Sequence, residues 1–307
     1  MHRVSRWTEA YGYAGLLVYT DNNLADPWLC ANMIIEATEE SAPLVAVQPL
    51  FEHPFAIANK IASLAAYRGR GVHLNLVTGG QSRHLAALND PLVKDHQARY
   101  DRLIEYWEVI RTLLTHREHV SYEGVRYPLD RARLGMALPE GLMPRLHLSG
   151  SSDDCVRAAK AVGATRLTYP GPPGDASGLG DGTGIRIGII ARDDAAIAWR
   201  VARSRFPEDA EGRRLHRVAA RLSPSVWHHE LSQREETGES VYWMLPFKTY
   251  KTFCPYLVGS HAEVGAVLAE YHAAGVRTII LDTPAEEDDL HHTALALAAA
   301  TPAGRIG

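Results

Sequence analysis

The sequence has little cysteine and no segment suited to a membrane. Its 307 residues include only three cysteines, Cys30, Cys155 and Cys254, with no Cys-x-x-Cys spacing among them. Scattered thiols of this kind are typical of a reducing cytoplasm, where they act as packing residues rather than as metal ligands. No apolar run approaches the ~20 residues of a membrane-spanning helix, and the amino terminus lacks the apolar core of a signal peptide. We therefore expect a cytoplasmic protein without a membrane partner.

An excess of positive charge is also missing. The formal net charge is −4, and 22% of the residues are charged, which gives no electrostatic reason to expect nucleic-acid binding. No Gly-x-Gly-x-x-Gly follows the first expected strand, and this disfavours a dinucleotide-binding fold. His228-His229-Glu230 and His291-His292 lack the His-x-His or His-Glu-x-x-His spacing of metal ligands. We interpret them as solvated, with a histidine-rich metal hydrolase kept as an alternative.

What the sequence does contain is a strand that enters a glycine turn, residues 71–80. Val72, Leu74 and Leu76 would face one way, and Asn75 and Val77 the other. A strand that is apolar on both faces suits a buried parallel sheet. Asn75 is the anomaly, because a buried amide costs free energy unless it finds partners. It either bonds to a neighbouring strand or lines a ligand site at the carboxyl end of a barrel strand.

Strands and helices alternate along the chain. This pattern predicts a parallel sheet with right-handed crossovers, and the number of units favours a TIM-type (β/α)8 barrel over an open sheet. We expect a single domain over residues 1–307, with an irregular insertion or mobile loop at about 207–256, a polar loop at 79–94 and a hairpin turning at Glu123-Gly124. The expected strands cover residues 16–20, 44–50, 72–78, 145–149, 165–169, 185–191 and 277–282.

Two helix starts carry polar clusters. Gly150-Ser151-Ser152-Asp153 lies between a strand and a helix, where free backbone N–H groups and hydroxyls form a phosphate cradle, although serine at such a place is commonly only a cap. In Asp95-His96-Gln97-Ala98-Arg99-Tyr100, Asp95 is a natural cap. His96 and Tyr100 are four residues apart and share a helix face, so both side chains could lean over the mouth of a barrel.

Three motifs together resemble the luciferase-like flavin monooxygenases of bacteria. They are Leu74-Asn-Leu-Val-Thr-Gly79, Asp95-His-x-x-Arg-Tyr100 and Gly150-Ser-Ser-Asp153, in that order and at similar spacings. The alkanesulfonate monooxygenase branch is the most similar, with further matches at Tyr122-Glu-Gly-x-x-Tyr127 and Leu257-Val-Gly259. The resemblance covers about residues 7–205 and 256–300.

The resemblance implies a barrel that uses reduced FMN, supplied by a separate flavin reductase, with O2 as co-substrate. It implies that Asn75 and Val77 line the flavin ring. Tyr100, Ser151 and Ser152 would hold the phosphate or the ribityl chain. The implied activity is a monooxygenase acting on a small organic substrate.

The expected catalytic residues are Arg186 and His96. Arg186 matches an active-site arginine of the sulfonate enzymes and would hold an anionic substrate or a peroxide charge, unless it is only a surface arginine at a strand end. Leu24 and Tyr169 stand where those enzymes carry a cysteine and a tryptophan, and Gly188 stands where they carry a histidine. Sulfonate is therefore a doubtful substrate, and Leu24 and Tyr169 are expected to bind a different one.

The resemblance also implies that the barrel is incomplete. The first strand of the family would precede the helix at residues 4–11, and the glycine-rich segment 171–184 replaces a crossover helix. Two alternatives stay open: a deazaflavin-dependent oxidoreductase on the same barrel and, because barrel parts are missing, a non-catalytic flavin-binding protein. Unpaired strand edges seek partners, so a homo-oligomer, a dimer or a tetramer, is expected.

Overall fold

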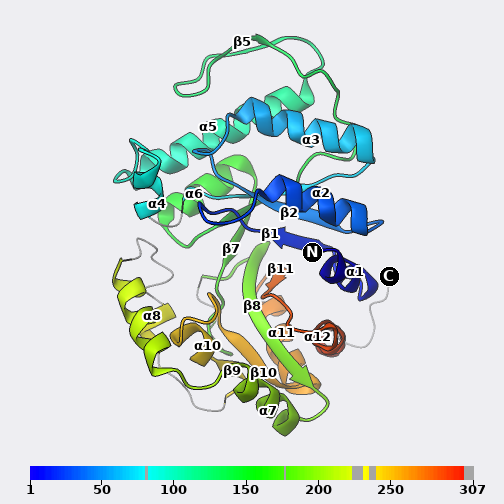
Figure 1. Cartoon of the computed structure of the whole chain (residues 1–307), viewed down its shortest axis with the longest axis vertical. Helices are drawn as coiled ribbons and strands as arrows, with labels where there is room; N and C mark the ends of the chain where they lie inside the picture. Colours follow the sequence, from blue (N-terminus) through cyan, green and yellow to red (C-terminus); the bar gives the residue numbers. More distant parts are fainter. Residues whose placement is uncertain (80–81, 176–177, 223–230, 235–239, 301–307) are drawn as a thin grey trace. The chain divides into compact units, whose positions relative to one another are not determined.

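The computed structural model describes residues 1–79, 82–175, 178–222, 231–234 and 240–300. The chain forms two compact units, an N-terminal unit of residues 1–166 and a C-terminal unit of residues 167–307. Each unit is built around its own parallel strands and covering helices (Figure 1). No helix in the described part of the chain has the length and apolar character needed to cross a membrane.

The N-terminal unit contains a parallel sheet in the order β1-β2-β3-β6 and a small antiparallel pair, β4-β5. Parallel neighbours need crossover connections, and helices supply them here. The helices are α1 (His2–Ala10), α2 (Pro27–Ala37), α3 (Pro54–Arg68), α4 (Ser82–Ala87), α5 (His96–Thr115) and α6 (Asp153–Val162). The strands are β1 (Gly15–Val18), β2 (Ala42–Val47), β3 (His73–Leu76), β4 (Val120–Tyr122), β5 (Leu129–Ala132) and β6 (Leu146–Ser149).

The two faces of this sheet differ in polarity. In one row across the strands, Val45 pairs with Leu74 and Leu74 with Leu146, and all three lie in the apolar core beneath the helices. The next row places Asn75 between Ala46 and His147. Because side chains alternate between faces along a strand, this second row points to the opposite face. The N-terminal unit therefore has a helix-covered apolar face and a second face that carries buried polar groups.

The C-terminal unit is organised around the long strand β8. Its Gly188 N–H donates to the Pro255 carbonyl, and its Ile187 carbonyl accepts from the Asp282 N–H. Because adjacent residues of a strand point their backbone groups to opposite edges, β10 and β11 lie on opposite edges of β8. The elements are β7 (Thr165–Thr168), whose first two residues precede the unit boundary, β8 (Thr183–Arg192), α7 (Ala195–Arg205), α8 (Ala210–Leu222), β9 (Tyr242–Trp243), α10 (Leu245–Lys248), β10 (Tyr256–Ser260), α11 (His261–Ala273), β11 (Val276–Leu281) and α12 (Glu287–Ala300).

All seven strands expected from the sequence are present, with ends shifted by at most three residues. The expected absence of a crossover helix after β7 is confirmed for the described residues 169–175 and 178–182, which form turns and bends. The missing first strand and the single domain over residues 1–307 stay predictions. The segment 207–256 is more regular than expected, since α8, β9 and α10 lie within it, and the 79–94 loop contains α4.

The predicted hairpin is present, but the prediction of a tight turn was wrong. Tyr122 pairs with Leu129, so six residues connect the strands instead of a two-residue turn at Glu123-Gly124. The cause lies on α5, where Glu105 Oε1 accepts the N–H groups of Arg126 and Tyr127 at 2.7 and 2.8 Å. This carboxylate holds the loop open, and hydrophobic periodicity carries no information about such a tertiary hydrogen bond.

Candidate functional site

The candidate site begins with Asn75 on the polar face of the N-terminal sheet. Its side chain is buried, and the Ser149 hydroxyl on β6 donates to Asn75 Oδ1 at 3.1 Å. Both interpretations offered by the sequence hold, because the Asn75 amide bonds to the neighbouring strand β6 and also lies near the carboxyl end of its own strand, β3. Val77 follows β3 and donates its backbone N–H to the Val47 carbonyl at 3.0 Å, which fixes the exit of the strand.

Tyr100 joins α5 to the loop before α6. Its ring is buried, and the side chains of Ser152, Cys155 and Thr78 surround its hydroxyl. Burial raises the pKa of Tyr100 far above its usual value, with Cys155 adding to the effect, so this hydroxyl stays protonated and remains a donor. The structure therefore brings together Tyr100 and Ser152, two of the residues expected to hold the cofactor.

Gly150 and Ser151 lie beside Tyr100 in the loop before α6. Gly150 has φ +152°, and a Cβ there would lie 2.9 Å from the Cys155 sulfur and 3.2 Å from the Tyr100 hydroxyl oxygen. Ser151 Oγ is buried and has no hydrogen-bond partner among the described residues. Ser152 caps α6 by accepting the Cys155 N–H at 3.3 Å. Buried hydroxyls rarely lack a partner. A free hydroxyl at a helix start fits the phosphate ester of a cofactor such as FMN.

His96 lies beside Tyr100, as its spacing on α5 predicts. The two rings pack edge to face, with centroids 5.1 Å apart. His96 Nδ1 lies 2.7 Å from Asp154 Oδ2 on α6. A carboxylate on one ring nitrogen fixes the orientation of an imidazole and leaves the other nitrogen, Nε2, as the one that can exchange a proton.

His147 is a site residue that the sequence reasoning missed. It lies next to Asn75 on β6, and its Nδ1 is buried without a hydrogen-bond partner among the described residues. Burial, His73 and Arg145 lower the pKa of His147 to about 4, so the imidazole is neutral at physiological pH. The signal was present in the alternation of Leu146-His147-Leu148-Ser149, which places His147 on the same face as Ser149.

A cavity of about 600 Å³ opens beyond the carboxyl ends of β1 and β2. Its lining includes Leu24, Trp28, Gln48 and Phe51, and Leu24 is half exposed at 54%. The lining mixes apolar side chains with polar and charged ones, among them Asp21, Glu52 and Lys60, and a concavity of this volume suits a small molecule. Leu24, one of the two residues expected to bind substrate, therefore lines a real cavity of the N-terminal unit.

Arg186 belongs to the C-terminal unit, and its charge is balanced there. Its guanidinium lies 3.0 Å from Asp282 Oδ1, and the Tyr256 hydroxyl donates to Asp282 Oδ2 at 2.8 Å. The Arg186 side chain is 15% exposed, so it is not a surface arginine. A Cβ at Gly188 would lie 2.3 Å from the Tyr256 ring. Glycine is required here because Tyr256 occupies the space that a side chain would need.

Tyr169 and the histidine-rich motifs complete the sequence candidates. Tyr169 is partly buried against two apolar clusters of the C-terminal unit. His228-His229-Glu230 lies outside the described residues. His291 is exposed, as interpreted, whereas His292 is partly buried and its ring stacks on His261 with centroids 5.1 Å apart.

Comparisons with known proteins agree with this geometry. A family model described as luciferase-like monooxygenase matches residues 1–278. The chain is 32% identical over 302 residues to BtrO of Niallia circulans, named a 4-(gamma-L-glutamylamino)butanoyl-[BtrI acyl-carrier protein] monooxygenase, covering 94% of this chain and 88% of that protein.

Two solved structures share the fold. EDTA monooxygenase (EmoA) from Chelativorans sp. BNC1 has a TM-score of 0.72 at 15% identity, covering 98% of this chain and 87% of that chain. The oxygenating constituent of 3,6-diketocamphane monooxygenase from Pseudomonas putida, in complex with FMN, has a TM-score of 0.69 at 15% identity, covering 97% and 90%. At such identities the likeness establishes the fold alone, a mostly parallel α/β fold of the luciferase-like kind.

Proposed function

Because the chain belongs to the luciferase-like monooxygenase family, we propose that it oxidises a small organic substrate with reduced FMN and O2. The observation that carries the proposal is the buried Ser151 hydroxyl, which lacks a partner among the described residues beside Gly150 and the start of α6. Deazaflavin use and flavin binding without turnover are the alternatives.

The corner formed by Tyr100, Ser151 and Ser152 would hold the phosphate or the ribityl chain. Three hydroxyls and the first N–H groups of α6 supply donors to an anionic group. Asn75 and Val77 would line the flavin ring, with Ser149 fixing the amide of Asn75. Reduced flavin, when bound, supplies the two electrons that let one oxygen atom enter the substrate while the other becomes water.

The proposed catalytic residues are His96 and Arg186. His96 is oriented by Asp154 and would move a proton at Nε2. Arg186 would orient the substrate through its N–H groups. Because Asp282 balances the charge of Arg186, a strongly anionic sulfonate gains less there than it would from an unpaired arginine. We therefore propose that this protein is like the alkanesulfonate enzymes in how it binds its cofactor, but not in its substrate.

The cavity that contains Leu24 would take the substrate, and Tyr169 is kept as a separately predicted substrate residue. BtrO acts on an acyl group attached to a carrier protein, according to its name, and on that basis we propose an acyl chain as the substrate class for this protein. A separate flavin reductase would be the partner that supplies reduced FMN. We also propose a homo-oligomer, since β1 pairs only with β2 and β11 only with β8 among the described residues.

The proposal is tested with the full chain, FMN, a flavin reductase, NADH and 18O2. A product that carries one 18O atom, from an acyl substrate offered free or attached to a carrier protein, is the expected result. Ser151→Ala should weaken binding of reduced FMN by ~1–3 kcal/mol, whereas Ser204→Ala, on the exposed side of α7, should leave it unchanged. Tight binding of deazaflavin instead of FMN, or FMN binding without oxygen uptake, would support one of the two alternatives.

A further inference from the structure

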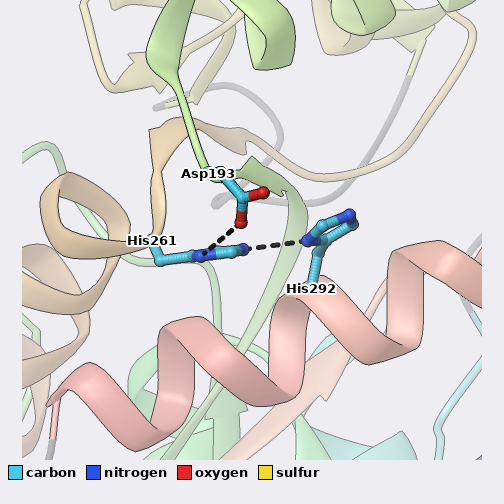
Figure 2. A group of neighbouring side chains, drawn as sticks. All are labelled: Asp193, His261 and His292. Carbon is cyan, nitrogen blue, oxygen red and sulfur yellow. Dashed lines mark hydrogen bonds and ion pairs between the residues drawn. The ribbon is translucent and has the colours of Figure 1, made fainter.

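Three metal-ligating side chains meet in the C-terminal unit, apart from the residues proposed for the flavin. Asp193 follows β8, His261 is the first residue of α11, and His292 lies on α12. Each offers one ligand atom, and these atoms lie within 4.8 Å of one another. Figure 2 shows the carboxylate and the second imidazole at opposite ends of the His261 ring. The chain thus brings together residues almost a hundred positions apart.

The contacts run in a line through His261. Its Nδ1 lies 3.4 Å from Asp193 Oδ1, and its Nε2 lies 2.9 Å from His292 Nδ1 (Figure 2). In metal sites, a ligating histidine commonly donates its other ring N–H to a carboxylate, which fixes the ring and makes it a better ligand. Asp193 lies on the Nδ1 side of His261 at ion-pair distance and can take this orienting role. His261 Nε2 and His292 Nδ1, which share a hydrogen bond without an ion, are then the two ligand atoms that an ion would engage.

The separation of these nitrogens is close to what a metal requires. Two nitrogens bound to a tetrahedral zinc at ~2.0–2.1 Å lie about 3.3–3.4 Å apart, so the pair would open by about 0.4 Å. His261 is only 18% exposed, whereas Asp193 is 84% exposed and has room to follow the ring.

The backbone that carries the two histidines is closely packed. A Cβ at Gly265 of α11 would lie 3.0 Å from the Ala296 carbonyl oxygen and 3.0 Å from the Ala299 Cβ on α12. Val264, Leu268 and Ala296 are buried in the same apolar cluster. Helices in such close contact hold His261 and His292 in place before any ion arrives, which lowers the entropic cost of binding.

We propose that His261 and His292 bind a divalent ion of the zinc class, with Asp193 orienting His261 from behind. Two imidazole nitrogens select zinc-like ions over magnesium or calcium, which prefer oxygen ligands. The ion would tie the start of α11 to α12, with water completing its coordination. Its role is to stabilise the C-terminal unit, and no step of the oxidation passes through it.

The test uses metal-free full-length protein titrated calorimetrically with ZnCl2 alone and, separately, with MgCl2. Wild-type protein should bind one zinc per chain and no magnesium. His261→Ala and His292→Ala should each weaken zinc binding at least about tenfold, and Asp193→Asn should weaken it by about tenfold. His291→Ala is the matched control, because its exposed ring neighbours His292 on the same helix and its loss should change nothing.

Several results would overturn the proposal. They are a wild-type protein that takes up no zinc, unchanged binding in His261→Ala or His292→Ala, and an equal loss in His291→Ala. A double variant, His228→Ala with His229→Ala, tests the other histidine-rich motif, and loss of zinc in that protein would place the ion elsewhere. If the alanine variants fail to fold, His261→Gln and His292→Gln replace them, and a zinc-dependent rise in melting temperature that both retain would equally contradict the site.

Discussion

At the scale of single residues, Gly150 is the position where the backbone itself shapes the candidate flavin site. Its φ of +152° is one that other residues rarely adopt, and a Cβ would press on Cys155 and the Tyr100 hydroxyl. Gly150→Ala should lower the free energy of unfolding by ~1–3 kcal/mol and weaken FMN binding as well, because Tyr100 is displaced from Ser152. Urea unfolding and a flavin titration measure the two effects.

Gly135→Ala is the control for that variant. Gly135 is exposed, its φ lies outside the left-handed region, and no atom lies within 4 Å of a Cβ placed there, so its substitution should change stability by less than about 0.5 kcal/mol. A Gly150→Ala protein as stable as Gly135→Ala, with unchanged FMN affinity, would remove Gly150 and its neighbours from the site.

His147 predicts a dependence of stability on pH. Burial, His73 and Arg145 lower its pKa to about 4, whereas in the unfolded chain the pKa is ~6.5. As the pH falls from ~6.5 towards ~4, the unfolded chain therefore binds a proton that the folded protein does not. The free energy of unfolding should fall by up to ~1.4 kcal/mol per pH unit over this window because of His147.

The measurement compares unfolding of wild-type protein and His147→Gln between pH 4 and pH 7. The variant should lose the part of the slope that His147 contributes, whereas His119→Gln, with an exposed side chain, should follow the wild type. Parallel curves for wild type and His147→Gln would mean that folding does not lower the pKa of His147.

At the scale of elements, α5 is held to the loop before it by a buried ion pair. The Nη1 and Nη2 groups of Arg102 donate hydrogen bonds to the two carboxylate oxygens of Asp90 at 2.9 and 2.8 Å, and the Asp90 side chain has no exposed surface. Breaking a buried pair leaves an uncompensated charge, so Arg102→Met should cost about 3–5 kcal/mol in chemical unfolding. Arg157→Met, which breaks the exposed pair with Asp101, should cost less than about 1 kcal/mol. Equal losses of unfolding free energy in the two variants would mean that the buried ion pair contributes no more than the exposed one.

The elements also separate what sequence patterns can predict from what they cannot. The strand β8 was predictable because buried parallel strands are near-continuous apolar runs, and β3 because Leu74 and Leu76 alternate along it. The short strand β10 lay partly inside the expected irregular segment, and its pairing with Gly188–Arg192 of β8 depends on a distant strand. The shape of the hairpin loop and the helix α4 were also missed, because both depend on contacts with residues distant in sequence, such as Glu105 for the loop.

At the scale of the whole molecule, the candidate site also combines local features that the sequence predicted with long-range contacts that it did not. The helix spacing of His96 and Tyr100 and the caps Asp95 and Ser152 are local, and the sequence predicted them. The contact between His96 and Asp154 joins helices far apart in the chain, and so does the pairing of His147 with Asn75. The Asp282 carboxylate that balances Arg186 could not be found by spacing, because parallel strands bring together residues with no fixed separation in sequence.

The two proposed ligands should protect different parts of the chain from hydrogen exchange. Binding to the folded state slows local opening in the elements that form the site. Zinc at ten times its Kd should slow exchange by about tenfold in the first turn of α11 and around His292 of α12. Reduced FMN, added without oxygen, should slow it most at the start of α5, the end of β3 and the start of α6.

Mass spectrometry of peptic fragments from the full chain resolves these segments. Zinc should have no effect on exchange in β3 or in the first turn of α5, and it should lose its effect on α12 in His261→Ala but not in His291→Ala. Protection by zinc in the N-terminal unit would contradict the metal site. Protection by FMN that avoids the starts of α5 and α6 would contradict the flavin site. Because the two ligands are read out at separate elements, either proposal can fail without affecting the other.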